Sequence, residues 1–289
     1  MKTHFKVLVC GASSFVASGV VEKLQAEGHY VETFSRGNEG RNGRAVRGNY
    51  LAIGEDKNLA NEYDVVVNYS VIKDGTVESN LHYIQSLVEM CKTKGVKKLI
   101  HFSSVMVYGY HLGHITESSP IETLEETWKK GYGAFKIAVD QYLLSIRDTL
   151  PFELVLVRPG YVLAGDRPCP FIKPLPLGIT LIKGDGKSKQ PIVKRDDVHK
   201  AIIRIVETED NLPVYHFFPN DDMTKYRFAK MQGYKHLIPM PKLIFKGVPF
   251  LMMKLGIMPK SMYSRFDGMY NECKFNSEQT EKKLQINFS

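Results

Sequence analysis

The sequence predicts an α/β fold: a Rossmann-type, doubly wound parallel sheet with a smaller C-terminal lobe. Short apolar runs alternate with helical stretches, which is the pattern of a parallel sheet. A glycine-led turn follows the first of these runs. The runs expected to be strands are Val7–Cys10, Val31–Phe34, Val65–Asn68, Leu99–Ser103 and Leu154–Arg158. Helices are expected near Phe15–Glu27, Val77–Lys94 and Tyr132–Ser145.

The texture of the chain changes after Pro159, where proline and glycine become frequent. A helix-like stretch, Val193–Glu207, and an apolar run, Val214–Phe218, then restore the earlier pattern. We therefore expect residues 1–164 to form a dinucleotide-binding domain, with 192–218 folding back onto it. Residues 165–289 would form mainly a substrate-binding lobe.

Composition narrows the class of protein. The chain of 289 residues starts directly before its first expected strand, and we expect no secretory signal. It has no run of eighteen apolar residues, so no membrane span is expected. The four cysteines are too scattered for a disulfide framework or a zinc pattern, which suits a reducing, cytoplasmic location. They are Cys10, Cys91, Cys169 and Cys273.

A metal site is also not expected. His111 and His114 have a spacing that could bind a metal ion. However, they lie in a polar segment with no supporting cysteines, and a simple loop is the favoured interpretation.

The first turn, Gly11-Ala-Ser-Ser-Phe-Val-Ala17, resembles a dinucleotide fingerprint between a strand and a helix. Its glycine permits a tight turn, and a helix N-terminus offers free N–H groups to a pyrophosphate. Ser14 and Ala17 replace the usual second and third glycines, but both are small enough for close backbone approach. Cofactor contacts are expected from Gly11, Ser13, Ser14, Phe15 and Ala17.

The end of the second expected strand bears on the choice of cofactor. An acidic residue there would bond the ribose of NAD, whereas an arginine can bind the 2′-phosphate of NADP. Ser35 and Arg36 occupy this position, and Glu32 lies too early in the strand. More arginines follow at Arg41, Arg44 and Arg47. NADP is favoured over NAD, with a solvated basic loop as the alternative.

Tyr132 and Lys136 are four residues apart on an expected helix and would share one face. A free phenol has a pKa of about 10, which is high for proton transfer at neutral pH. A nearby cation lowers such a pKa and suits the phenol to general acid–base catalysis.

Together these segments resemble the extended short-chain dehydrogenase/reductases of the nucleotide-sugar epimerase/dehydratase type. Besides the glycine turn, the matching segments are Asp64-Val-Val-Val-Asn68, Asn80, Ser103-Ser-Val-Met-Val-Tyr-Gly109, Tyr132-x-x-x-Lys136, Arg158-Pro-Gly160 and Asp196-Asp-Val198. The resemblance implies that Tyr132 is the acid/base, that Lys136 binds the nicotinamide ribose, and that Ser104 holds the reacting oxygen. Ser103 would be a neighbour.

The resemblance further implies cofactor contacts from Asn68 and Pro159, and a homodimer. Dehydratases of this family carry Asp-Glu after the catalytic serine or threonine. This chain has Val105 and Met106 there, which disfavours dehydration. We expect NADP-dependent reduction of a nucleotide-linked keto-sugar. The alternatives are a 4-epimerase with retained cofactor, a ketoreductase of a natural product, and a non-catalytic NADP-binding regulator.

The net charge of +8 is unevenly distributed. Residues 223–265 contain nine Lys/Arg and no Asp or Glu, together with seven of the eleven methionines. The stretch could attract an anionic substrate, lie on an anionic membrane surface as a peripheral contact, or pack on the core with its lysines solvated. Gly247 and Pro249 are expected to interrupt any long helix. Of the two functional interpretations, attraction of an anionic substrate is favoured, and nucleic acid is not expected as a partner.

Overall fold

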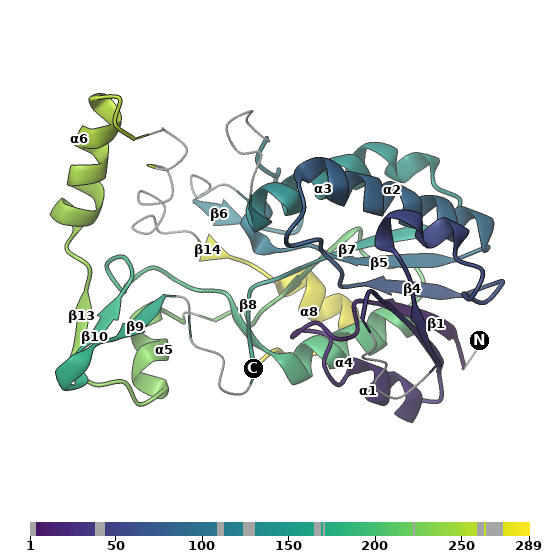
Figure 1. Ribbon diagram of the computed structural model, residues 1–289. Helices are drawn as coiled ribbons and strands as arrows, with labels where there is room; N and C mark the ends of the chain where they lie inside the picture. The colour runs from purple at the N-terminus through teal and green to yellow at the C-terminus, as the bar shows by residue number, and fades with distance from the viewer. Residues whose placement is uncertain are drawn as a thin grey trace.

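Figure 1 shows the computed structural model, in which a seven-stranded parallel sheet forms the larger part of the molecule. The structure describes residues 4–37, 44–108, 113–123, 131–164, 169, 171–221, 223–258, 263 and 274–289. The strands of the sheet are β1 (Lys6–Cys10), β2 (Tyr30–Ser35), β3 (Arg44–Arg47), β4 (Val65–Asn68), β5 (Lys98–Phe102), β7 (Glu153–Pro159) and β12 (Val214–Phe217). Their order is β12-β7-β5-β4-β1-β2-β3, and the direction of strand addition reverses between β1 and β4.

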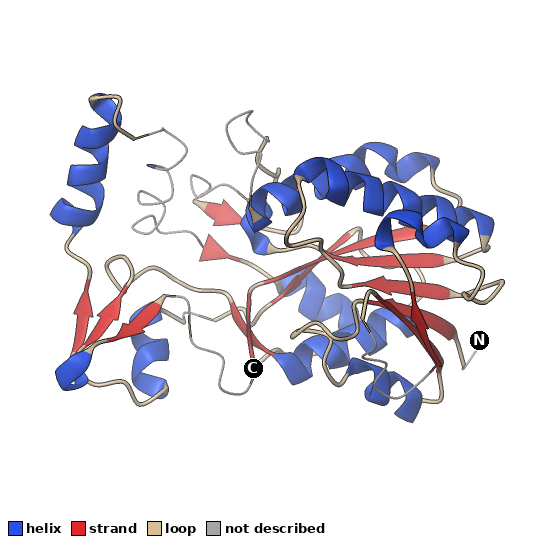
Figure 2. Cartoon of the chain, in the orientation of Figure 1, coloured by secondary structure: helices blue, strands red, loops and turns tan. Residues whose placement is uncertain are grey.

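The central strands are apolar because both faces of the sheet are covered. Every residue of β4 and of β5 is buried. Helices α2 (Val77–Thr93) and α3 (Tyr132–Ile146) lie on one face, and α1 (Val20–Ala26), α4 (Arg195–Glu207) and α8 (Glu278–Leu284) lie on the other (Figure 2). The expected Rossmann-type fold is therefore confirmed.

Alternation along β1 divides its side chains between the two cores. Val7 and Val9 belong to the core that also contains residues of α1, α4 and α8. Leu8 and Cys10 belong to the core with residues of α2 and α3. Successive side chains of a strand point to opposite faces, so a single five-residue strand contributes to both layers.

Several boundaries differ from those expected. Helix α1 begins at Val20, not near Phe15, because residues 11–19 form consecutive turns. A solvated basic loop is the alternative interpretation of the segment after Arg36, and the last residues of that segment form the edge strand β3. The expected helix from Val193 loses its first two residues to the short strand β11 (Ile192–Lys194).

The smaller lobe has its own sheet and its own core. Strands β9 (Ile172–Pro174), β10 (Thr180–Ile182) and β13 (Leu237–Pro239) pair in the order β13-β10-β9, next to helix α5 (Lys225–Met231). Phe171, Ile182 and Phe228 form the centre of its core. A parallel pair, β8 (Tyr161–Leu163) with β11 (Ile192–Lys194), lies between the lobe and the large sheet (Figure 1).

The C-terminal residues return to the large sheet, contrary to the expectation that 219–289 belongs to the lobe. Strand β14 (Lys274–Phe275) pairs with β6 (His114–Ile115). Leu284 and Phe288 join the core below the sheet. The amide and hydroxyl of Ser289 both donate to Asp197, at 2.9 and 2.7 Å. Residues 274–289 are therefore part of the larger, Rossmann-type portion of the molecule.

The remaining helical segments are short. They are η1 (Tyr50–Glu55), η2 (Val105–Val107), η4 (Arg147–Thr149), η5 (Pro176–Gly178), η6 (Leu243–Gly247) and α6 (Val248–Lys254). No helix among the described residues is long and apolar enough to span a bilayer. The described residues also contain no group of three or more His, Cys, Asp or Glu that could hold a metal ion. Arg41, His111 and Cys273 lie outside the described residues.

Candidate active site

The site is built at the edge of the sheet where β1, β4, β5 and β7 end. In parallel sheets these carboxyl ends lie together, and ligands bind where the strand order reverses. Here the reversal falls between β1 and β4, which end at Cys10 and Asn68. The sequence places its conspicuous small and polar residues directly after these ends.

The turn after β1 is shaped for close approach of another group. Gly11 has φ +77, and its amide donates to the carbonyl of Phe34 at 3.0 Å. A side chain at this position would overlap the Ser70 hydroxyl. Within the described part of the chain, the amides of Ala12 and Ser13 have no hydrogen-bond partner. These free donors fit a pyrophosphate, as a dinucleotide cofactor requires.

The other fingerprint residues hold the turn together. The amides of Ala17 and Ser18 donate to the Ser14 carbonyl at 3.1 and 3.0 Å. Ala17 itself is fully buried. Helix α4 braces the same turn, since His199 Nε2 lies 2.9 Å from the carbonyl oxygen of Val16. Ser13 is exposed and therefore accessible to a ligand.

Arg36 follows β2 directly and is exposed. Its guanidinium lies over the Tyr50 ring, 5.5 Å from the centroid. Glu32 is fully buried inside β2, where Tyr63 donates to its carboxylate and Arg44 lies 3.7 Å away. Among the described residues of this tip, Arg36 and Arg47, which pairs in register with Ser35, are exposed cations, whereas Glu32 is buried and not available to a ligand.

Asn68 is at the end of β4, but its side chain is engaged inside the protein. Its amide nitrogen lies 3.0 Å from His101 Nδ1, and its oxygen accepts from the Tyr83 hydroxyl and the Ser70 amide. The side chain is fully buried. Asn68 therefore shapes the loop after β4, and its buried side chain is bonded to partners within the protein. Pro159, the last residue of β7, is likewise buried.

The structure brings Tyr132, Lys136 and Ser104 to the same end of the sheet. Tyr132 begins α3 and is 43% exposed, whereas Lys136 is buried one turn later. The Lys136 ammonium lies 5.6 Å from the centre of the Tyr132 ring. Ser104 follows β5, and its oxygen accepts from the Met106 amide at 3.2 Å. Its own hydroxyl proton thus remains available to donate to a substrate oxygen.

Lys136 is held beneath the tyrosine by a short hydrogen bond from its ammonium to the Phe102 carbonyl. Burial lowers the pKa of Lys136 to about 8, while the nearby Asp140 carboxylate acts in the opposite direction. The ammonium has three donors, so two remain for a ribose or for other partners.

The lowered pKa of Lys136 gives a pH prediction. In the free enzyme, kcat/KM should fall as the pH rises through about 8, because the neutral amine no longer supports proton transfer by Tyr132. Deprotonation of Lys136 should not lower the stability of the folded protein over the same pH range. The unfolded state binds more protons between pH 8 and 10.5, so the Lys136 contribution to stability rises with pH in that window.

Two measurements distinguish these effects. Rates of the wild type and of Lys136→Arg are compared from pH 6 to 10, with circular dichroism at each pH. The arginine variant stays charged, so its alkaline decline should move upward. A common decline in both proteins would show that another group is responsible.

Met106 lies beside Tyr132, in the segment after Ser104 where the sequence resemblance places an acidic pair in dehydratases. It is 46% exposed, and its methyl group is 3.5 Å from the position that a side chain at Gly133 would occupy. Gly133 follows Tyr132 directly. Position 106 therefore presents an apolar thioether side chain near the tyrosine and supplies no second proton donor.

Sequence reasoning missed a buried ion pair below the site. Arg158 on β7 contacts Asp140 on α3, with Nη2 and Nε at 3.0 and 3.1 Å from one carboxylate oxygen. Burial raises the pKa of Asp140, and Arg158, the Ser103 hydroxyl and Lys136 act against that rise. The sequence showed Asp140 four residues after Lys136, a helical spacing that could have suggested it.

The pair continues into a chain of hydrogen bonds. Arg158 donates to the Tyr108 hydroxyl at 2.6 Å, and this hydroxyl lies 2.7 Å from His216 Nε2. His216 Nδ1 is 2.7 Å from the carbonyl of Asn276. Burial lowers the pKa of His216 to about 4, so the ring is neutral, and these partners assign its proton to Nδ1. The network connects α3 to the C-terminal segment.

The sequence comparison points to one family. A profile described as "NAD dependent epimerase/dehydratase family" matches residues 7–218. This range contains every residue of the candidate site. No curated protein sequence matches the chain.

Solved structures with the same fold cover almost the whole chain. MoeE5 in complex with UDP-glucuronic acid and NAD has a TM-score of 0.71 at 20% identity, covering 98% of this chain and 94% of its own. A UDP-N-acetylglucosamine 4-epimerase from Methanobrevibacter ruminantium has a TM-score of 0.72 at 18% identity, covering 99% and 94%. A human epimerase family protein with NADPH has a TM-score of 0.69 at 18% identity, covering 98% and 94%. At these identities the likeness establishes the fold alone.

Proposed function

Because this chain belongs to the NAD dependent epimerase/dehydratase family, we propose that it is an NADP-dependent reductase of a nucleotide-linked keto-sugar. The observation that carries the proposal is the placement of Tyr132, Lys136 and Ser104 at the carboxyl end of the sheet, beside the turn at Gly11. A non-catalytic dinucleotide-binding protein would need none of these three side chains. Solved relatives hold UDP-sugars, which supports a nucleotide sugar as the substrate class.

The cofactor would be held by the turn 11–17, by Arg36 and by Lys136. A bound nicotinamide supplies hydride for reduction. The Ser104 hydroxyl would donate a hydrogen bond to the carbonyl oxygen and fix its position, keeping its own proton. Tyr132 gives its proton to this oxygen as negative charge develops there. The positive charge of Lys136 then stabilises the tyrosine phenolate that is left.

Reduction is preferred to 4-epimerisation because of Arg36. An exposed arginine at the tip of β2 suits the 2′-phosphate of NADP, the usual donor in reductions. A reductase exchanges its cofactor in each cycle, whereas an epimerase retains it. The apolar Met106 supports the absence of a dehydration step.

Arg36→Asp should weaken NADPH binding by at least about tenfold and leave NADH binding nearly unchanged, since the carboxylate repels only the extra phosphate. Equilibrium fluorescence titration of both cofactors measures this. Arg227→Asp, at an exposed arginine of the lobe, is the matched control. Tighter binding of NADH than of NADPH by the wild type would overturn the cofactor assignment.

Reduction itself is tested with 4-keto derivatives of nucleotide sugars, by following NADPH oxidation. Mass spectrometry of the purified protein complements this assay. A tightly retained dinucleotide, together with interconversion of UDP-sugars without added cofactor, would favour the epimerase. The proposed homodimer is tested by light scattering after size-exclusion chromatography.

A further inference from the structure

An exposed apolar stripe runs along the helix that η6 and α6 form in the lobe. Ile244, Val248, Leu251 and Leu255 recur at steps of four, three and four residues, which places them on one side of a helix. All four are more than half exposed, from 51% at Val248 to 64% at Leu255. Leu243 and Ile257 extend the exposed apolar surface at the two ends. We call these six residues the apolar stripe.

The helix carrying the stripe is continuous, contrary to the expected interruption at Gly247 and Pro249. Gly247 has helical φ and ψ of −68 and −48, and η6 therefore runs directly into α6. The wider turn of η6 precedes Pro249, which cannot donate to the preceding turn.

Residues on the other sides of this helix make contacts within the lobe, and the stripe faces outward. Pro249 is buried, and the ring of Phe250 lies 5.7 Å from that of Tyr263. The Lys254 ammonium lies 5.7 Å from the centre of the Phe250 ring. The stripe residues instead remain exposed, so burial of this helix in the core, one of the three interpretations of the basic stretch, does not hold.

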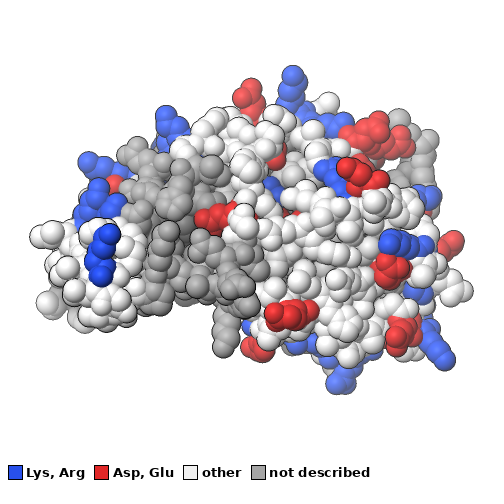
Figure 3. Space-filling model, turned by 90° about the horizontal axis from the view of Figure 1, so that it is seen from above, with Lys and Arg blue, Asp and Glu red and all other residues white. Residues whose placement is uncertain are grey.

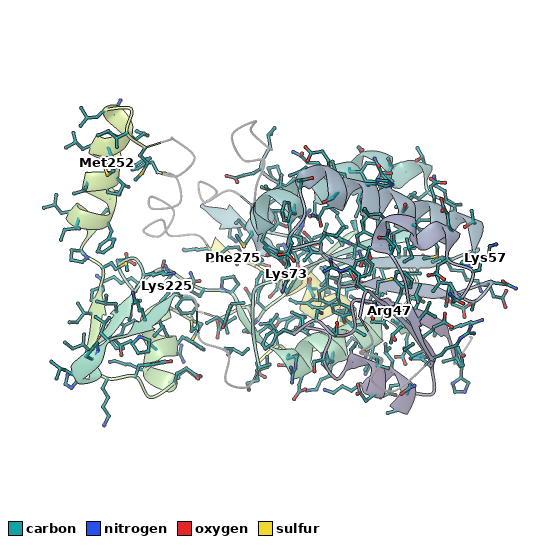
Figure 4. The ribbon with its side chains drawn as sticks, viewed as in Figure 1. Arg47, Lys57, Lys73, Lys225, Met252 and Phe275 are labelled. Carbon is teal, nitrogen blue, oxygen red and sulfur yellow. The ribbon has the colours of Figure 1, made fainter. Side chains whose placement is uncertain are left out.

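Exposed lysines flank the apolar stripe at its two ends, and further exposed cations lie in the same lobe. Lys242 and Lys254 are exposed at its two ends. Arg227, Lys230 and Lys235 are exposed elsewhere in the same lobe, whereas Lys225 is buried and bonded to the Lys183 carbonyl (Figure 4). Residues 223–265 contain no acidic residue. Figure 3 shows Lys and Arg side chains beside uncharged surface at this end of the molecule.

We propose that the apolar stripe and its flanking lysines bind the surface of an anionic lipid bilayer. Exposed leucine, isoleucine and valine side chains can enter the boundary between headgroups and acyl chains. Lysines at the ends of the helix then meet the anionic headgroups.

Two other occupants fit less well. A polar nucleotide sugar does not need an apolar stripe, and Figure 1 shows α6 well apart from α3, where Tyr132 lies. A second copy of the chain would bring the same basic face against itself, and like charges disfavour that contact. An anionic lipid surface satisfies both the apolar and the basic character.

Vesicle flotation tests the proposal. The wild type should float with phosphatidylcholine vesicles containing roughly a third phosphatidylglycerol, but not with phosphatidylcholine alone. Leu251→Asn/Leu255→Asn should lower the bound fraction because it removes apolar contact. Lys242→Glu/Lys254→Glu should lower the partition coefficient by about tenfold or more, since each lysine near an anionic surface contributes roughly a fivefold factor.

Matched controls lie on the nucleotide-binding side. Tyr30→Asn changes an equally exposed apolar residue, and Lys282→Glu/Lys283→Glu reverses two exposed lysines. Both should float like the wild type, and all variants should keep the wild-type circular dichroism. Because binding is measured without turnover, its failure would not affect the proposed enzymatic function.

Four results would overturn the proposal. The first is a wild type that does not float. The second is flotation of both Leu251→Asn/Leu255→Asn and Lys242→Glu/Lys254→Glu to the same extent as the wild type. The stripe could instead hold a dimer, which light scattering would detect as monomers in Leu251→Asn/Leu255→Asn. Finally, charge reversal could raise KM for a nucleotide sugar while no protein floats, which would support attraction of substrate instead.

Discussion

The enzyme carrying Tyr132→Phe is expected to turn over roughly a hundred to ten thousand times more slowly than the wild type. The substitution keeps the ring, which lies over the Lys136 ammonium, and removes only the hydroxyl that would carry the proton. Dinucleotide binding should therefore stay close to wild type. Steady-state kinetics and cofactor titration on the same preparation measure both quantities.

The chain contains its own matched control for this experiment. Tyr226 and Lys230 on α5 have the same spacing, and Lys230 lies 5.1 Å from the centre of the Tyr226 ring. This second pair is in the lobe, away from the end of β5 that presents Ser104. Tyr226→Phe should leave turnover unchanged. Equal losses in the two variants, or near-normal turnover in Tyr132→Phe, would reject the assignment of Tyr132 as the acid/base.

The two tyrosine–lysine pairs also show what sequence can and cannot establish. Spacing alone does not distinguish them, because both place a phenol and an ammonium on one helical face. The surrounding segments do: the first pair lies on the next predicted helix after Ser104 at a strand end, whereas the second lies beyond the proline- and glycine-rich segment that follows Pro159. The parallel sheet was predictable for the same reason: its buried strands are apolar runs bounded by turns.

Long-range contacts were harder to predict. The Arg158–Asp140 pair joins β7 to α3, and the helical spacing of Asp140 to Lys136 does not indicate that its partner lies on a distant strand. The return of residues 274–289 to the large sheet depends on burial of Leu284 and Phe288 against distant strands. The side chain of Asn68 is drawn inward by Tyr83 and His101, two partners from other elements. Such contacts follow from the packed fold and not from periodicity.

The exposure of side chains in the basic stretch 223–265 could also not be predicted from the sequence. Nine basic residues are visible in the sequence, but only the structure separates buried Lys225 from exposed Lys242 and Lys254. The apolar residues of the same stretch could have formed a core. Their exposure along α6 is a property of the lobe's packing, and it changes the favoured partner from a small anion to a lipid surface.

Breaking the buried ion pair should have the largest effect on stability. Arg158→Met leaves the Asp140 carboxylate buried without its main partner and removes a donor to the Tyr108 hydroxyl. Both members of the pair are almost fully buried. The expected loss is about 3–5 kcal/mol in the free energy of unfolding, measured by urea denaturation. Enzymatic activity should also fall, because the ion pair no longer holds α3 against β7.

The double variant Arg158→Met/Asp140→Leu should recover much of this stability, because no charge is then stranded and the apolar side chains fill similar volume. Lys23→Met provides the control, since it breaks an exposed pair with Asp196 at 2.8 Å and should cost no more than about 1 kcal/mol. If Arg158→Met costs as little as this control, the buried pair does not stabilise the catalytic helix. If the double variant regains stability but not turnover, the pair positions Tyr132 and Lys136 beyond its contribution to folding.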